Sequence, residues 1–365
     1  MNVCIIGDSL TGLSIAKNLI NKKINVHIYS KLKIKNSKFN QTIGIAKNNL
    51  EFFNREISKL SAKDFWEIKK IEIYSEKLKD KPILNFENQK KDLFYMIKIN
   101  SFYKLLNNQL LKSKFCYKKI IKHNNFYEKL LKEKKYDLII NCDSNNFLSK
   151  KYFSQKIVKD YYNTAYTTIL QHEKIDNKTA IQIFTKFGPI AFLPISSTET
   201  SVVFSLEVKY KKYTNAQILN IIKNNNFKFK IKKILELNNF QLKSSNLRNY
   251  YYKNILAFGD LLHKIHPLAG QGFNMTIRDI KILSEIIQNK IDLGIQIDSL
   301  IFEEFEKKTK HTNFIFSNGI DFIYEFFNFE KKNKNQNLSK ILRFVGKNKK
   351  LTHTLIKFAD KGLNI

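Results

Sequence analysis

The chain has 365 residues, of which 43% are hydrophobic and 13% aromatic, with only 11 glycines and 4 prolines. This length and composition predict a folded chain of roughly two domains, and they exclude a disordered tail, a collagen-like repeat and a disulfide-stapled small protein. The formal net charge is +32, but only four of the 64 basic residues are arginines, the side chains that nucleic-acid readers favour, so we expect no nucleic-acid partner.

Lys, Asn and Ile are abundant together, as AT-rich coding DNA would produce, so much of the charge follows from composition. Attraction to an anionic membrane or an acidic partner stays open. The cysteines Cys4, Cys116 and Cys142 lack paired spacing, which indicates a reducing compartment and no metal site. No segment reaches the roughly 18–20 uninterrupted apolar residues of a membrane span, and no leader precedes the first apolar run. We expect a cytoplasmic protein, with peripheral contact at the inner face of the cell membrane left open.

The first predicted element is a strand–helix–strand unit over residues 2–29. Its strand ends in a glycine turn, which allows the backbone to approach a pyrophosphate at the positive end of the following helix. Gly7 is the predicted tight turn and Gly12 the predicted close contact between helix and strand. Ser9 replaces the middle glycine of G-x-G-x-x-G, and Ser30 stands where a ribose-binding acid is usual. By itself this motif is compatible with an ordinary strand-to-helix turn.

The second predicted element is a hairpin of an antiparallel sheet. Aromatic and aliphatic residues alternate around Gly188-Pro189, between the strand-like stretches 179–184 and 201–208. Nothing in this segment carries chemistry by itself.

The third segment, residues 255–279, carries the strongest pattern. A buried strand ends in Gly259-Asp260, which places a carboxylate at the carboxyl end of a sheet, where open α/β sheets bind ligands. A loop with Pro267 and two glycines follows, and a helix begins near Gly272. The three segments together hold six of the 11 glycines and three of the four prolines. His263 and His266 have no third ligand at a suitable spacing, so we interpret them as loop residues.

In combination these segments resemble the para-hydroxybenzoate-hydroxylase-type flavin monooxygenases. Residues 259–279 are similar to the second FAD-binding signature of that superfamily. Residues 266–274, HPLAGQGFN, resemble more closely its ubiquinone-biosynthesis branch, the 2-polyprenyl-6-methoxyphenol hydroxylases. Residues 188–194 are similar to a turn of the substrate-domain sheet in that branch, and residues 137–144 to the third, "DG" motif. All the motifs stand in the family's order.

The resemblance implies a non-covalently bound FAD. The residues that it implies for cofactor binding are Gly7, Ser9, Gly12, Asp143, Gly259, Asp260, Gly270, Gln271, Gly272, Phe273 and Asn274. The residues that it implies beside the isoalloxazine ring, where oxygen reacts, are His266, Pro267 and Leu268.

The resemblance also implies a reaction, namely hydroxylation of a polyprenylated phenol in ubiquinone biosynthesis. NADPH or NADH would reduce the flavin, and a flavin C4a-hydroperoxide formed with O2 would deliver the oxygen atom. A quinone-biosynthesis protein assembly would be a further partner.

Two alternatives stay open. One is the same fold acting on another phenolic or prenyl substrate, and the other is a scaffold paralogue with weakened FAD binding. The second is favoured by Ser9, by Ser144 in place of the DG glycine, and by Asn40 and Asn100, which stand near where relatives place flavin-contacting arginines.

The predicted fold class is α/β, or α+β overall. A Rossmann-like FAD-binding domain takes residues 1–70, 95–150 and 250–300, and an antiparallel-sheet substrate domain takes residues 71–94 and 151–249. Residues 301–365 form a helical C-terminal segment with an aromatic-rich face. That face either packs on the FAD-binding domain or meets a membrane or a partner enzyme.

Overall fold

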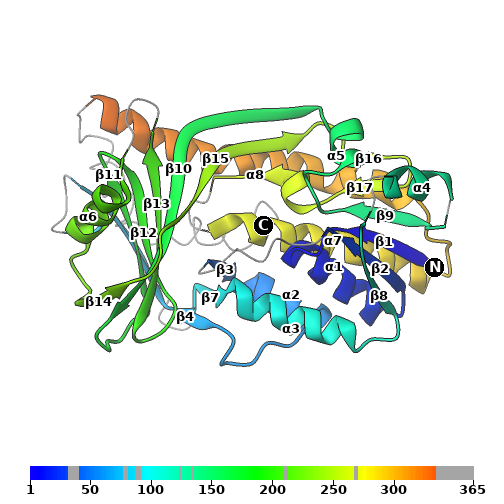
Figure 1. Ribbon diagram of the computed structural model, residues 1–365, viewed down its shortest axis with the longest axis horizontal. Coiled ribbons are helices and arrows are strands. Elements are labelled where there is room, and N and C mark those ends of the chain that lie inside the picture. The colour runs from blue at the N-terminus through cyan, green and yellow to red at the C-terminus, as the bar shows by residue number, and fades with distance from the viewer. Residues whose placement is uncertain are drawn as a thin grey trace.

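The computed structural model describes residues 1–31, 41–76, 81–87, 92–122, 125–133, 135–208, 213–266 and 270–333. These residues form three sheets with helices packed on them (Figure 1). The α-helices of the described residues are α1 (Leu10–Asn21), α2 (Lys47–Glu56), α3 (Ile99–Leu111), α4 (Phe126–Lys132), α5 (Phe147–Tyr152), α6 (Asn215–Asn225), α7 (Gln271–Asp292) and α8 (Leu300–Asn333).

The first sheet has six strands in the order β16-β17-β9-β1-β2-β8. Their bounds are β1 (Asn2–Ile6), β2 (Asn25–Ser30), β8 (Cys116–Ile120), β9 (Leu138–Asn141), β16 (Tyr251–Tyr252) and β17 (Ile255–Ala257). All but β16 are parallel to their neighbours. β1 and β9 are buried apolar runs, as expected of parallel strands covered on both faces. Since the strands are parallel, β1, β9 and β17 present their carboxyl ends at one edge.

The second sheet has nine strands in the order β18-β15-β10-β13-β12-β11-β5-β6, with β14 paired to β10. Their bounds are β5 (Lys70–Ser75), β6 (Leu84–Glu87), β10 (Lys156–His172), β11 (Thr179–Thr185), β12 (Gly188–Pro194), β13 (Glu199–Glu207), β14 (Ile231–Ile234), β15 (Asn238–Leu247) and β18 (His263–Lys264). One face packs on α6 through a core that includes Phe192, Phe204 and Ile218. The other face is turned toward the parallel sheet (Figure 1).

The predicted hairpin in this sheet is present, but its turn lies two residues earlier than expected. Lys186 and Phe187 form the turn, while Gly188 and Pro189 already belong to β12. Gly188 has φ +133°, and a Cβ there would lie 1.9 Å from the carbonyl oxygen of Ser205. This glycine therefore serves the close approach of β12 to β13.

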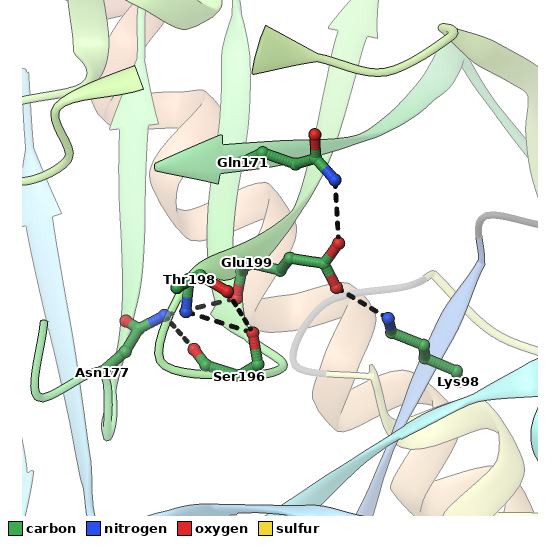
Figure 2. Close-up of polar contacts among 6 residues, drawn as sticks. All are labelled: Lys98, Gln171, Asn177, Ser196, Thr198 and Glu199. Carbon is green, nitrogen blue, oxygen red and sulfur yellow. Dashed lines mark hydrogen bonds and ion pairs between the residues drawn. The ribbon is translucent and has the colours of Figure 1, made fainter. Parts of the chain in front are cut away.

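A small third sheet connects the two large ones. It has the order β3-β7-β4, with β3 (Thr42–Ala46), β4 (Trp66–Ile68) and β7 (Phe94–Lys98). At the end of its middle strand, β7, Lys98 Nζ lies 2.7 Å from the Glu199 carboxylate of the nine-stranded sheet, which Gln171 also contacts (Figure 2). Burial opposes ionisation of Glu199, but the hydrogen bonds from Lys98 and Gln171 outweigh it and lower the pKa of this carboxyl.

The C-terminal helix α8 runs along both large sheets (Figure 1). The aromatic side chains predicted to form its face divide in two. Phe302, Phe305 and Phe316 are buried, whereas Phe314 and Phe322 are exposed. The expected continuation over residues 334–365 lies outside the described residues. Within the described part of the chain, no helix has the length and apolar content needed to cross a membrane.

Candidate functional site

The sequence motifs that stand far apart in the chain meet at the carboxyl edge of the parallel sheet. Gly7 follows β1 with φ +102°, and a Cβ there would lie 3.3 Å from the backbone nitrogen of Asp143, which follows β9. Gly259 follows β17 with φ +63°, and a Cβ there would lie 2.7 Å from Cγ2 of Thr11. The first, second and DG motifs therefore form one cluster.

Gly12 has the contact that the sequence predicts. A Cβ on Gly12 would lie 2.1 Å from the carbonyl oxygen of Gly7, so only glycine allows α1 to start this close to the turn. Ser9 is the N-cap residue of α1, but its side chain makes no capping hydrogen bond. The helix terminus is thus set against the glycine turn, the geometry in which dinucleotide folds receive a pyrophosphate.

One feature of this turn was not predicted. The Asp8 carboxylate, between Gly7 and Ser9, accepts a hydrogen bond from the Tyr103 hydroxyl at 3.0 Å and lies 3.0 Å from Lys118 Nζ. Burial, together with the adjacent carboxylate, raises the pKa of Tyr103. Lys118 thus balances the negative charge beside the glycine turn.

Two further carboxylates, Asp143 and Asp260, lie around the buried thiol of Cys142. Burial raises the pKa of Cys142, and both carboxylates raise it further. Asp260 is exposed in a short 3-10 turn, and Asp143 Oδ1 accepts a hydrogen bond from the backbone of Asn145. Carboxylates at this edge suit the hydroxyl groups of a ribityl chain, which are hydrogen-bond donors.

The loop before α7 and the start of that helix form the other half of the site. Gly270 is the N-cap residue of α7 with φ +63°, and it lies against Gly44 of β3. The buried Asn274 side chain fixes this arrangement, because its Nδ2 donates to the Gly44 carbonyl at 2.9 Å and its Oδ1 accepts from Ala46 N at 2.8 Å. The Gln271 Oε1 atom is buried without a hydrogen-bond partner in the described part of the chain.

Gly272 and Phe273 lie in the first turn of α7, and the Phe273 ring packs edge-on against Phe102 of α3. Pro267 and Leu268, which the family resemblance implies beside the oxygen-reacting side of the ring, lie outside the described residues, as does Asn40.

His266 is 1% exposed and lies between the nine-stranded sheet and α8. Its Nε2 is 3.2 Å from Ser205 Oγ of β13, and its ring packs against Tyr161 of β10 and Tyr324 of α8. Burial, with a smaller effect of Lys159, lowers the pKa of His266 to about 3, so the imidazole is neutral at physiological pH.

The interpretation of both histidines as loop residues is confirmed for His266 but is wrong for His263. It lies in β18 and is buried, with Nε2 2.5 Å from Asp279 Oδ2, and Asn313 Nδ2 donates to the other oxygen of that carboxylate. Among the described residues no group of His, Cys, Asp and Glu could hold a metal ion.

The residues of this edge fit FAD. A Cβ would block the turn at Gly12 and crowd it at Gly7, and among the described residues the buried Gln271 Oε1 has no hydrogen-bond partner. The adenosine end departs from the usual pattern, because Ser30 ends β2 where an acid would hold the ribose. We therefore assign the pyrophosphate to the start of α1 and the ring to the start of α7 as an expectation.

The fold is that of the FAD-dependent monooxygenases. p-Nitrophenol 4-monooxygenase PnpA from Pseudomonas putida DLL-E4 superimposes with a TM-score of 0.77 at 10% identity, covering 100% of this chain and 98% of that one. PqsL of Pseudomonas aeruginosa, a probable FAD-dependent monooxygenase, gives a TM-score of 0.68 at 11% identity, covering 95% and 98%. These likenesses show the fold.

The chain belongs to the squalene epoxidase family, whose model matches residues 135–359. It is also 25% identical over 241 residues to the mitochondrial ubiquinone biosynthesis monooxygenase COQ6 of Dictyostelium discoideum, covering 52% of this chain and 49% of that protein. Over 161 residues it is 27% identical to the 3-demethoxyubiquinol 3-hydroxylase of Escherichia coli (strain K12), covering 42% and 41%. The chain spans about half the length of the curated relatives it matches.

Proposed function

We propose that this chain is an FAD-dependent monooxygenase that hydroxylates the aromatic ring of a polyprenylated phenol, with NADPH or NADH as the electron donor. The observation that carries the proposal is the meeting of Gly7, Gly12, Asp143 and Gly259 at one edge of the parallel sheet. The ubiquinone-biosynthesis names of the relatives support the substrate class.

In this proposal the chain binds and orients, while bound FAD supplies the reaction with O2 that yields one oxygen atom for the ring and one for water. The start of α1 holds the pyrophosphate, and Asp260 and Asp143 accept hydrogen bonds from the ribityl hydroxyls. The substrate ring lies between the loop at His266 and the facing side of the nine-stranded sheet. The buried, neutral His266 and its aromatic neighbours keep water away from that place.

The first test of this proposal is the flavin content of the purified protein. We expect a two-band visible spectrum and near one FAD per chain. Asp260→Ala should weaken FAD binding by about ten- to a hundredfold, the effect of losing one charge-assisted hydrogen bond. Asp176→Ala is a matched control, because Asp176 is exposed between β10 and β11. Colourless protein that does not bind added FAD would contradict the proposal and leave the scaffold alternative.

A second candidate function is epoxidation of a carbon–carbon double bond in a prenyl chain, which the squalene epoxidase family match favours. Both reactions insert one oxygen atom from O2, so mass alone does not separate them. Reaction of the reduced holoenzyme with a polyprenylated phenol under labelled O2 gives a catechol or a hydroquinone in the first case and an epoxide, opened by acid to a diol, in the second.

The proposed localisation is inside the cell, with peripheral contact at the membrane that holds a polyprenylated substrate. A quinone-biosynthesis assembly is a proposed partner. Flotation of the purified protein with vesicles that contain anionic lipid tests the membrane contact, and a control with neutral vesicles separates charge from apolar insertion.

A further inference from the structure

Asp8 belongs to the turn after β1, but this turn is bound to the end of β2. The backbone nitrogen of Gly7 donates to the carbonyl oxygen of Tyr29 at 2.8 Å. Asp8 is the residue after Gly7, and Ser30, the last residue of β2, is the residue after Tyr29. In dinucleotide folds an acid near the end of the second strand accepts hydrogen bonds from the ribose hydroxyls. Ser30 leaves β2 without that acid, whereas Asp8 places a carboxylate close by.

Two side chains from other elements hold the Asp8 carboxylate in place. The Tyr103 hydroxyl of α3 donates to Oδ2 at 3.0 Å, and Lys118 Nζ of β8 lies 3.0 Å from the same oxygen. Lys118 also donates to Asn107 Oδ1 of α3 at 2.9 Å, which fixes the ammonium group. Because β2 lies between β1 and β8 in the sheet, a contact from the turn after β1 to β8 spans β2. The carboxylate is therefore directed toward the side of the sheet on which β2 ends.

The chemistry of this carboxylate suits an acceptor of ligand hydroxyls. The contacts from Tyr103 and Lys118 are both to Oδ2, and a carboxylate has about four lone-pair sites, so they can stay in place while further donors bind. The side chain of Asp8 is 12% exposed and that of Lys118 is 21% exposed, so a ligand at this edge can reach them. The charge of Lys118 also offsets the repulsion between the carboxylate and a pyrophosphate at the start of α1.

We propose that Asp8 is the acid that binds the adenosine ribose of FAD, in place of the acid that β2 lacks. The ribose hydroxyls donate to its carboxylate, and Tyr103 and Lys118 are positioning residues, since they act through Asp8. This inference rests on the proposed function, because it names the residue that holds one part of the proposed cofactor. With this assignment, Ser30 no longer indicates a weakened adenosine site.

Titration of the full chain, freed of flavin, with ADP and with 2′,3′-dideoxy-ADP tests the assignment. The two nucleotides share the adenine and the pyrophosphate, but only ADP has the ribose hydroxyls. The wild type should bind ADP at least about tenfold more tightly, the effect of one hydrogen bond to a charged group. Asp8→Ala should abolish this preference, and Asp8→Asn, which keeps an acceptor oxygen without the charge, should retain part of it. Asp143→Asn is the matched control, because it changes the carboxylate assigned to the ribityl chain and should leave the preference intact.

The same titrations test the two positioning residues. Tyr103→Phe removes one hydrogen bond to Oδ2 and should lower the preference for ADP, whereas a purely structural role would weaken both nucleotides equally and leave their ratio unchanged. Lys118→Met should weaken both nucleotides, because it leaves the charge of Asp8 unbalanced beside the pyrophosphate, and should do so much less in the Asp8→Ala background.

The outcomes separate this inference from the proposed function. If FAD binds but the wild type shows no preference for ADP, or if Asp8→Ala keeps the wild-type preference, the assignment of Asp8 is wrong while the proposed function stands. If the wild type binds neither FAD nor ADP, the proposed function fails and this inference fails with it.

Discussion

Acid should destabilise this protein through His266, and the size of the effect follows from its burial. An unfolded histidine has a pKa near 6.5, whereas burial lowers the pKa of His266 in the folded chain to about 3. Between these values the unfolded chain binds a proton that the folded chain does not, so the free energy of unfolding falls as the pH falls. From pH 7 to pH 5 the loss from this one group is about 2 kcal/mol.

The assay is urea unfolding at pH 7 and pH 5 for the wild type and for His266→Leu. Leucine removes the titrating group, so the variant should lose about 2 kcal/mol less stability than the wild type over this interval. The difference between the two losses cancels the contribution of carboxylates that titrate in both proteins. Equal losses would mean that His266 titrates normally in the folded chain, and the argument from its burial would be refuted.

Three further predictions follow from the contacts. Gly12→Ala should abolish FAD binding, because the added Cβ lies 2.1 Å from a backbone oxygen. Gly294→Ala is the control: its Cβ meets open space, and the strain of its φ of +63° falls on stability, so FAD titration of the folded variant should be unchanged. Asp279→Ala should cost about 1–3 kcal/mol in denaturant unfolding, because it leaves the buried His263 ring nitrogen and the Asn313 amide without their acceptor, and an unchanged unfolding free energy would contradict these contacts. Glu199→Gln should change the unfolding free energy by less than about 1 kcal/mol, since its lysine partner is half-exposed, and a larger loss would show a stronger bridge between the sheets.

The parts of the site that depend on the backbone were predictable from the sequence. In a chain with few glycines, a glycine that persists marks a place where a side chain does not fit, and Gly7, Gly12 and Gly259 all have this property. The apolar runs of β1 and β17 likewise predicted a buried parallel sheet. Gly44 could have been found by the same reasoning, because it is one of the few remaining glycines and it lies against the loop before α7.

The parts that depend on side chains from distant segments were not predictable. Asn163 contacts Ser205, 42 residues away in the sequence, and Tyr324, 161 residues away. None of the three belongs to a local sequence pattern. Asp8 was visible in the glycine turn, but its charge could be interpreted only once Lys118 of β8 was seen beside it. In α8 the buried phenylalanines Phe302, Phe305 and Phe316 lie at helical spacing on one face. The exposed Phe314 and Phe322 lie off that face.

The loop between β18 and α7 is fastened at both ends to different parts of the molecule. At its start, β18 pairs with β15 of the nine-stranded sheet. At its end, Asn274 is bonded to β3. Because one short segment of the chain is anchored on two sheets, a substitution at either anchor, such as Asn274→Ala, is expected to alter the position of the start of α7 relative to the nine-stranded sheet.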